Sequence, residues 1–169
     1  MSISMYRLTV PVFQRGLTTL SAYLDKAEKF AAEKAIDPVE LVATRLAPDM
    51  LPLSGQYQRA TDSAKLAVAR LTGSEAPKFE DNETTIAELR ARVAKTEAYL
   101  ATVATEAFEN AETREVIISS GGNKVVFRGD DYVMNFALPN FYFHVSMAHA
   151  ILRNRGAPVG KLDYLGSFS

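Results

Sequence analysis

The chain has 169 residues, a formal net charge of −1 and 47% hydrophobic residues, which fits one soluble globular domain over residues 1–169. No basic run is present, which argues against a nucleic-acid partner, and no apolar run approaches the ~20 residues of a membrane-spanning helix. The chain contains no cysteine, which excludes disulfides, thiolate metal sites and cysteine nucleophiles. Together with an N-terminus unlike a signal peptide, this predicts a cytoplasmic protein without a membrane partner.

Two long amphipathic helices are predicted in the N-terminal half. Apolar or small residues recur every three or four positions from Tyr6 to about Lys34, and again from about Leu53 to Leu71. Between these segments, Asp37 and Pro38 have the residue types of a helix cap and a first helical position, which predicts a short extra helix. Gly73 is suited to end the second long helix.

A third long helix is predicted to follow Thr85. Thr85 and Glu88 have the spacing of a capping box, and an apolar face continues from there as far as Ala107. Glu88 and Arg92 lie four positions apart, so we expect them to form an ion pair on another face of this helix.

The hydrophobic period changes in the C-terminal third. Two β-rich runs, Glu115–Ser119 and Lys124–Arg128, flank the sequence SGGN, which predicts a β-hairpin. A last helix should follow, capped by Asp130 or Asp131 and ending near Arg155, and Pro139 is expected to kink or split it.

The predicted fold class is therefore all-α. Long amphipathic helices bury their apolar faces against one another, and a four-helix bundle with a short extra helix and a small β-hairpin before the last helix is the simplest arrangement. In the C-terminal tail, Leu162, Tyr164 and Leu165 supply enough apolar surface to pack on this bundle.

The last helix carries both histidines of the chain. His144 and His149 are five positions apart, which separates them by about 140° on a helix, so they do not easily share one metal ion. Asn140 and His144 are four apart and lie on one face among apolar residues. Such polar groups need partners: they bond to each other and to a neighbouring helix, or they line a pocket. Ser146 does not face His144, so a Ser–His pair is not expected.

The same helix is apolar nearly all round from Phe136 to Leu152. A helix of this kind is central in its fold or is covered by a partner subunit. This pattern favours a homodimer.

Three segments resemble the DinB/YfiT-like four-helix bundles, and within them a bacterial family of domains of unknown function. They are the opening MYRLTVPVFQRGLTTLSAYLDKAEKFA, the segment QRATDSAKLAVARLTG, and ALPNFYFHVSMAHAILRNRGAPVGKLDYLG near the end. Together they span nearly the whole chain. The resemblance implies the same bundle fold.

The resemblance also implies the location of a site. Metal-bearing members of the superfamily hold a divalent ion with three histidines, and the corresponding positions here are His144, Asn140 and a residue near Gln58 or Arg59. Only His144 is a histidine. Because Asn is a poor ligand for zinc or nickel, we expect no tightly bound metal cofactor, although Asp62 or Gln58 could substitute if they face inward.

Three functions follow from these residues. The first is a small-molecule-binding protein with a degenerate, metal-free site formed by Asn140, His144, Asp62 and Tyr57. The second is a metal-dependent transferase acting on a small thiol or its conjugate, with His144 as the surviving ligand. The third is a dimeric structural or interaction protein. Asp62 is either a solvated charge beside Lys65 or a buried carboxylate that orients His144 as a base.

Overall fold

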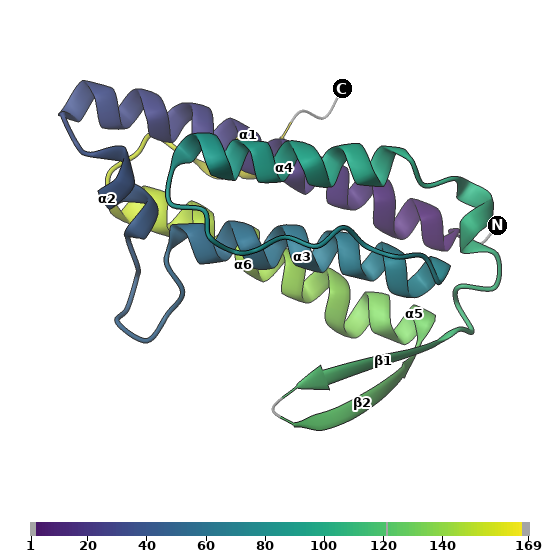
Figure 1. The fold of residues 1–169 in the computed structure, drawn as a ribbon. Coiled ribbons are helices and arrows are strands. Elements are labelled where there is room, and N and C mark those ends of the chain that lie inside the picture. Colours follow the sequence, from purple (N-terminus) through teal and green to yellow (C-terminus); the bar gives the residue numbers. More distant parts are fainter. Residues whose placement is uncertain (1–2, 121, 167–169) are drawn as a thin grey trace.

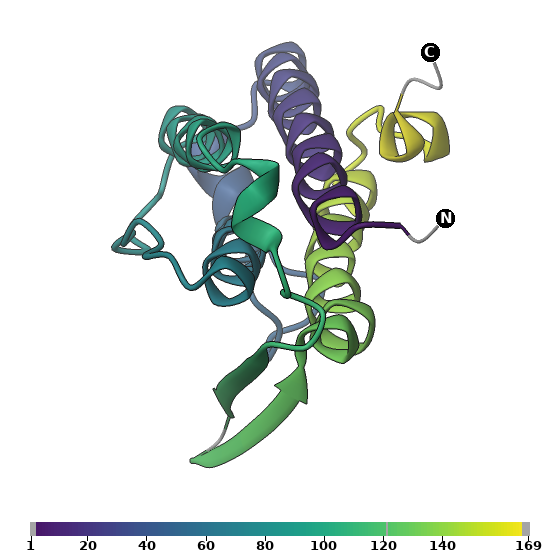
Figure 2. The same ribbon diagram turned by 90° about the vertical axis from the view of Figure 1, so that its right-hand side faces the viewer.

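The computed structural model describes residues 3–120 and 122–166 and contains four long helices that lie side by side (Figures 1 and 2). They are α1 (Met5–Lys34), α3 (Leu53–Thr72), α4 (Ile86–Ala101) and α6 (Leu138–Asn154). The predicted four-helix bundle is therefore confirmed. No helix in the described part of the chain is both long enough and apolar enough to cross a membrane.

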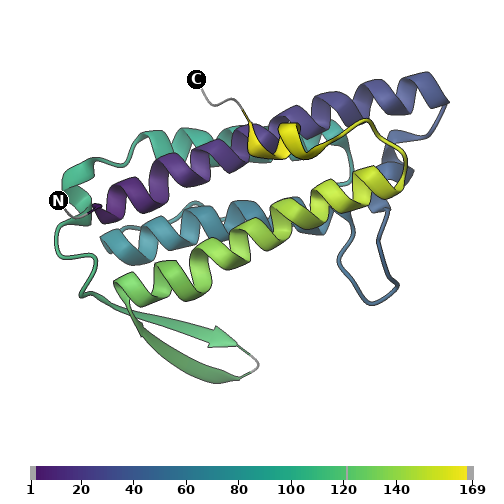
Figure 3. The same ribbon diagram turned by 180° about the vertical axis from the view of Figure 1, so that it is seen from behind.

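Chain direction in the bundle is set by the long connection between α3 and α4. Residues 73–85 run back along the bundle, so α4 points the same way as α3, while α1 and α6 point the opposite way (Figure 1). As a result α6 packs against both α1 and α3, and Figure 3 shows it on the near side of the bundle below α1. The side chains of α6 are thus available to two helices far away in sequence.

Shorter elements occupy the ends of the bundle. The short helix α2 (Pro38–Ala43) is capped by the side chain of Asp37, as predicted. Strands β1 (Glu115–Ser120) and β2 (Asn123–Arg128) pair antiparallel with Val116 opposite Phe127. This confirms the predicted hairpin, which projects away from the helices (Figures 1 and 3).

Helix α4 begins as predicted and ends earlier. Thr85 and Glu88 form the full capping box, but the helix stops at Ala101, and Ala107 lies in the separate 3₁₀ helix η1 (Thr105–Phe108). The change of direction places Phe108 against Tyr6 of α1, with ring centroids 5.7 Å apart. The apolar residues beyond Ala101 therefore cover the end of α1 without continuing the helix.

The last helix starts at a glycine, and neither aspartate serves as its N-cap. Helix α5 (Gly129–Tyr132) has Arg128 at its N-cap position, so the predicted caps Asp130 and Asp131 lie in its first turn. A Cβ atom on Gly129 would lie 1.8 Å from the carbonyl oxygen of Ala111, which explains why the chain turns at a residue without one.

Pro139 divides the last helix in the way a proline is expected to. The π-helical segment η2 (Val133–Ala137) joins α5 to α6, and Pro139 stands in the first turn of α6. A proline cannot donate the usual backbone hydrogen bond, and π-helical turns accommodate such interruptions. The wider turn is placed beside the cleft described below.

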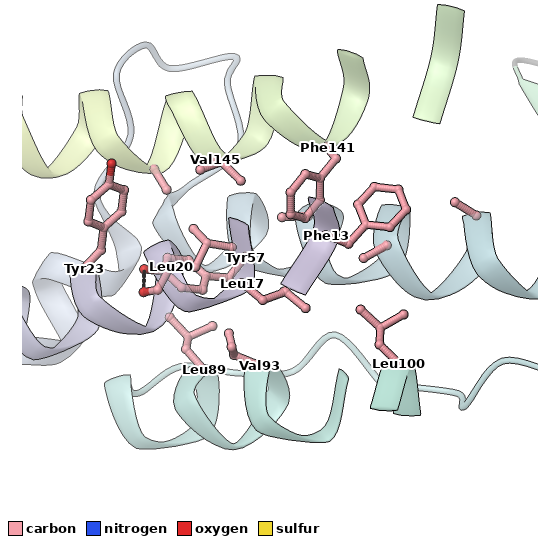
Figure 4. Packing of buried hydrophobic residues seen from close by; sticks show 14 of the residues in the cluster. Phe13, Leu17, Leu20, Tyr23, Tyr57, Leu89, Val93, Leu100, Phe141 and Val145 are labelled. Carbon is pink, nitrogen blue, oxygen red and sulfur yellow. Dashed lines mark hydrogen bonds between the residues drawn. The ribbon is translucent and has the colours of Figure 1, made fainter. Parts of the chain in front are cut away.

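The core fills the space between the four long helices (Figure 4). Phe13 of α1 and Phe141 of α6 meet edge to face with centroids 5.0 Å apart. Tyr57 of α3 is fully buried, and its hydroxyl donates a hydrogen bond to the carbonyl oxygen of Leu20 at 2.8 Å. This bond ties α3 to α1 inside the core.

The C-terminal tail forms the short helix α7 (Lys161–Leu165), which packs on α1 and, through Tyr164, on α6. Asp163 pairs with Lys26 of α1 at 2.7 Å, and the ring of Tyr164 packs against those of His149 and Tyr142. The tail docks as predicted, except that Leu162 is 74% exposed.

Candidate functional site

His144 is held by Gln56, a buried residue of α3. Its Nδ1 lies 2.8 Å from Oε1 of Gln56, and Nε2 of the same amide donates to the carbonyl oxygen of Leu51 at 3.0 Å. The second bond fixes which end of the amide faces His144. Since an amide oxygen can only accept, Nδ1 of His144 carries the proton and Nε2 keeps its lone pair.

Burial keeps His144 neutral. The residue is 8% exposed, and desolvation, aided by the positive charge of Arg59, lowers its pKa to about 4. At neutral pH it is therefore an uncharged imidazole with a proton-accepting nitrogen.

Asn140 lies one turn earlier and bonds to a different residue of α3. Its Nδ2 donates to Oγ of Ser63 at 2.7 Å. The two polar residues of this face thus bond to the neighbouring helix, as predicted, whereas the predicted bond between Asn140 and His144 is not found among the described residues. Asn140 also satisfies the alternative prediction, because it lines a pocket.

That pocket, here called the Asn140 cleft, has a volume of about 180 Å³ and lies between α3 and the last helix. Its polar lining comes from both sides: Arg59, Asp62, Ser63, Arg70, Tyr132 and Asn140. Leu66, Phe136 and Ala137 complete the wall. Six of the nine lining residues are polar, so a ligand in this cleft would be recognised mainly through hydrogen bonds and charge.

Two guanidinium groups enter the cleft with different partners. Arg70 donates to the hydroxyl of Tyr132 at 2.9 Å and lies over its ring. Arg59 pairs with Asp62 at 3.2 Å and also with Asp81. Burial raises the pKa of Tyr132, and the charge of Arg70 opposes that rise, so this hydroxyl stays protonated at neutral pH.

Asp62 belongs to a network around Arg92 and does not contact His144. Its Oδ1 accepts from Nη2 of Arg92 at 2.9 Å and lies 3.1 Å from Nζ of Lys65. The interpretation of Asp62 as the carboxylate that orients His144 is therefore wrong, because Gln56 has that place. Asp62 is not simply solvated either, since its side chain is 20% exposed.

Arg92 itself corrects a second expectation. Its side chain is 1% exposed and pairs with Asp62, Asp81 and Glu83, whereas Glu88 accepts the backbone N–H groups of Thr84 and Thr85. The predicted surface pair of Glu88 with Arg92 does not form, because Arg92 points inward. The arginine joins α4 to α3 and to the loop before α4.

The remaining predicted residues lie away from the cleft. Tyr57 is part of the core, and its hydroxyl donates a hydrogen bond to the carbonyl oxygen of Leu20. Gln58 donates to Glu83 at 2.9 Å. His149 points to the other side of the last helix, where its Nδ1 lies 2.7 Å from the hydroxyl of Tyr23. The structure thus brings Asn140 and Asp62 together in the cleft, leaves Tyr57 apart, and places His144 outside the cleft lining.

The residues present do not fit a metal ion of the kind that the superfamily holds. His144 is the only imidazole on this face, Asn140 offers only a carboxamide oxygen, which is a poor ligand for zinc or nickel, and the oxygen of Gln56 already accepts from His144. Among residues 3–120 and 122–166, no group of three His, Cys, Asp or Glu side chains is placed to hold a metal. A stable site needs three or four such ligands.

Sequence reasoning missed Gln56, Arg59 as a cleft residue, and Arg70. Gln56 and Ser63 are seven positions apart on α3, as His144 and Asn140 are four apart on α6. Residues spaced by whole turns lie on one face, so this spacing was a usable signal. The sequence does not show that this face of α3 contacts the face of α6 that carries Asn140 and His144, because that depends on how the helices pack.

Comparison with known proteins agrees with the fold. Residues 5–165 match the family described as Domain of unknown function (DUF1993). A DinB family member protein from Shewanella denitrificans, known from a crystal structure, shares 44% sequence identity with this chain. The match covers 97% of this chain and 93% of the other, with a TM-score of 0.89. No curated protein matches. The chain therefore belongs to the DUF1993 family of domains of unknown function and shares the bundle of the DinB family.

Proposed function

We propose that this protein binds a small molecule with an acidic group in the Asn140 cleft, and that it does so without a metal. The observation that carries the proposal is the convergence of Arg59, Arg70 and Asn140 on one cavity of about 180 Å³. A cavity of this size accepts a compact ligand.

The charges of the cleft favour a carboxylate or phosphate group. Arg59 shares its charge with Asp62 and Asp81, but the hydrogen bond of Arg70 is to a neutral hydroxyl, that of Tyr132. A guanidinium group whose charge is not offset by a direct carboxylate contact binds a planar acid through two parallel hydrogen bonds. The second carboxamide atom of Asn140, Oδ1, is an acceptor for a ligand hydroxyl or amine.

His144 contributes as a neutral base close to this cleft. Its Nε2 lone pair follows from the bond between Nδ1 and Gln56, and Arg59, which lines the cleft, is near enough to lower its pKa. A bound acid that neutralises Arg59 would raise the pKa of His144. Ligand binding is thus expected to be visible at His144.

The test is a titration with malonate and succinate at constant ionic strength, followed by ¹H–¹⁵N NMR. We expect saturable shifts of backbone amides on α3 and the last helix, together with an upward shift of the His144 pKa. Arg70→Met should weaken binding about tenfold, the loss of one charge-assisted contact.

Arg7→Met is the matched control, because Arg7 is an exposed arginine of α1 outside the cleft lining. Its affinity should equal that of the unmodified protein. Shifts that do not saturate, or equal affinities for Arg70→Met and Arg7→Met, would contradict the proposal.

A metal-dependent transferase acting on a small thiol is the alternative that His144 itself favours. Its free Nε2 and its held Nδ1–H match the way proteins orient a metal-binding imidazole. The other ligand positions do not support it. Metal analysis of purified protein, with His144→Ala as control, tests this alternative: stoichiometric zinc or nickel lost in the variant would replace the metal-free proposal.

We also propose a homodimer, on the basis of large apolar side chains that are exposed on the last helix and on the hairpin. Met134 and Phe143 of the last helix are 56% and 53% exposed, and Val126 of the hairpin is exposed as well. Exposed apolar residues of this size mark candidate interfaces. Sedimentation at micromolar concentration tests the proposal: Phe143→Ser should shift a dimer toward the monomer, and a strictly monomeric unmodified protein would refute it.

A further inference from the structure

A second cavity lies on the opposite side of the last helix, between α6 and α7. It has a volume of about 270 Å³ and is lined by Ser146, His149, Lys161 and Tyr164. This cavity, here called the His149 pocket, shares no lining residue with the Asn140 cleft. Each of its four lining residues carries a hydrogen-bonding group.

Tyr23 fixes the tautomer of His149. Tyr23 is 0% exposed, and its hydroxyl lies 2.7 Å from Nδ1 of His149. If Nδ1 carried the proton and donated it, the tyrosine hydroxyl proton would be left in the interior without this acceptor, which is costly. The hydroxyl therefore donates to Nδ1, and the proton of the neutral imidazole is on Nε2. His149 and His144 thus have opposite tautomers.

The other lining residues also offer donors. Ser146 donates its hydroxyl proton to the hydroxyl oxygen of Tyr164 at 3.1 Å, which leaves the proton of Tyr164 for another acceptor. Lys161 contributes an ammonium group. An Nε2–H, a phenolic O–H and an ammonium around one cavity form a donor set that suits an acceptor with negative charge.

The neighbouring carboxylate is already engaged. Asp163 lies next to the pocket, but its Oδ1 pairs with Lys26 at 2.7 Å and its Oδ2 accepts the backbone N–H of Gly160 at 2.8 Å. Burial lowers the pKa of His149; the charge of Asp163 raises it, and the weaker effect of Arg153 lowers it. Lys161 and Arg153 are therefore the positive charges near the pocket, and Asp163 opposes them.

We propose that the His149 pocket binds an oxyanion group, a carboxylate or a phosphate, through His149, Lys161 and Tyr164. A divalent cation does not suit this pocket, because Nε2, the ring nitrogen of His149 that does not contact Tyr23, is protonated in the neutral form. The site is independent of the function proposed for the Asn140 cleft.

The experiment is a titration with inorganic phosphate and, separately, with acetate at pH 7 and constant ionic strength, followed by the ring ¹⁵N signals of both histidines. His149 should show the Nε2–H tautomer, and its ring signals should shift saturably with at least one of the two anions. In Arg70→Met, which removes the acid-binding arginine of the Asn140 cleft, the ring signals of His144 should stay in the Nδ1–H form and change less than those of His149, which provides a control within the same molecule.

Lys161→Ala, a change at an exposed residue, should lower the affinity for the anion about tenfold. Lys95→Ala should leave this affinity unchanged. Arg70→Met should also leave it unchanged, which separates this pocket from the Asn140 cleft. An Nδ1–H tautomer of His149, the absence of saturable shifts with both anions, or equal affinities for Lys161→Ala and Lys95→Ala would overturn the proposal.

Discussion

Nδ1 of His144 lies 2.8 Å from Oε1 of Gln56, a residue 88 positions earlier in the chain. The Gln56 amide is in turn oriented by the carbonyl oxygen of Leu51. These two hydrogen bonds leave Nε2 of His144 as an acceptor. Gln56 therefore has the place that the sequence analysis considered for the carboxylate of Asp62. The chemistry available at His144 is therefore that of a neutral imidazole held by a neutral amide.

Stability should fall as the pH is lowered from about 6.5 to about 4. The pKa of His144 is about 4 in the folded protein, against about 6.5 in an unfolded chain. Across this interval the unfolded state takes up the proton first, so acidification favours unfolding by about 2–3 kcal/mol. Urea unfolding at pH 7 and pH 4.5 measures the difference. In His144→Gln this difference should shrink, and an unchanged difference would show that other groups cause it.

Replacing Gln56 by glutamate should raise the pKa of His144. A carboxylate at this position would stabilise the imidazolium form, as a nearby opposite charge does. NMR titration of the His144 ring protons measures the pKa. Gln58→Glu is the control, because Gln58 bonds to Glu83 and not to His144. Equal His144 pKa values in the two variants would contradict the assigned contact.

Arg92→Met should destabilise the protein by about 3–5 kcal/mol. The substitution removes a buried cation and leaves the carboxylates that it pairs with, those of Asp62, Asp81 and Glu83, without that partner. Arg90→Met is the matched control on the same helix: Arg90 pairs with Asp25 and Glu28 at the surface, and losing such pairs costs about 1 kcal/mol or less. Denaturant unfolding compares the two. Equal losses would mean that the Arg92 network is not stabilising.

Gly16→Ala should destabilise the contact between α1 and α6 by about 1–3 kcal/mol. A Cβ atom on Gly16 would lie 2.3 Å from the ring of Phe141, and this ring is fully buried. Gly160→Ala is the control, since the nearest atom to its Cβ is 3.9 Å away. Thermal unfolding measures both, and similar melting temperatures for the two variants would contradict the close approach.

The secondary structure could largely be predicted from local pattern. The capping residues Asp37 and Thr85 begin their helices as expected, and the β-rich runs around residue 121 pair as a hairpin. These features depend on neighbours within a few positions, which a sequence displays directly. The start of the last helix was missed, because Gly129 is required by the approach of a distant backbone segment at Ala111.

The sequence by itself determined that Asn140 and His144 share a face of the last helix while His149 lies apart, because helical geometry depends only on spacing. The tertiary structure alone decided their partners. Packing of α6 between α1 and α3 places His144 against Gln56 and His149 against Tyr23. These two hydrogen bonds are the reason that we assign opposite tautomers to the two imidazoles. The tertiary structure also turned Arg92 inward, since only the assembled bundle places three carboxylates around it.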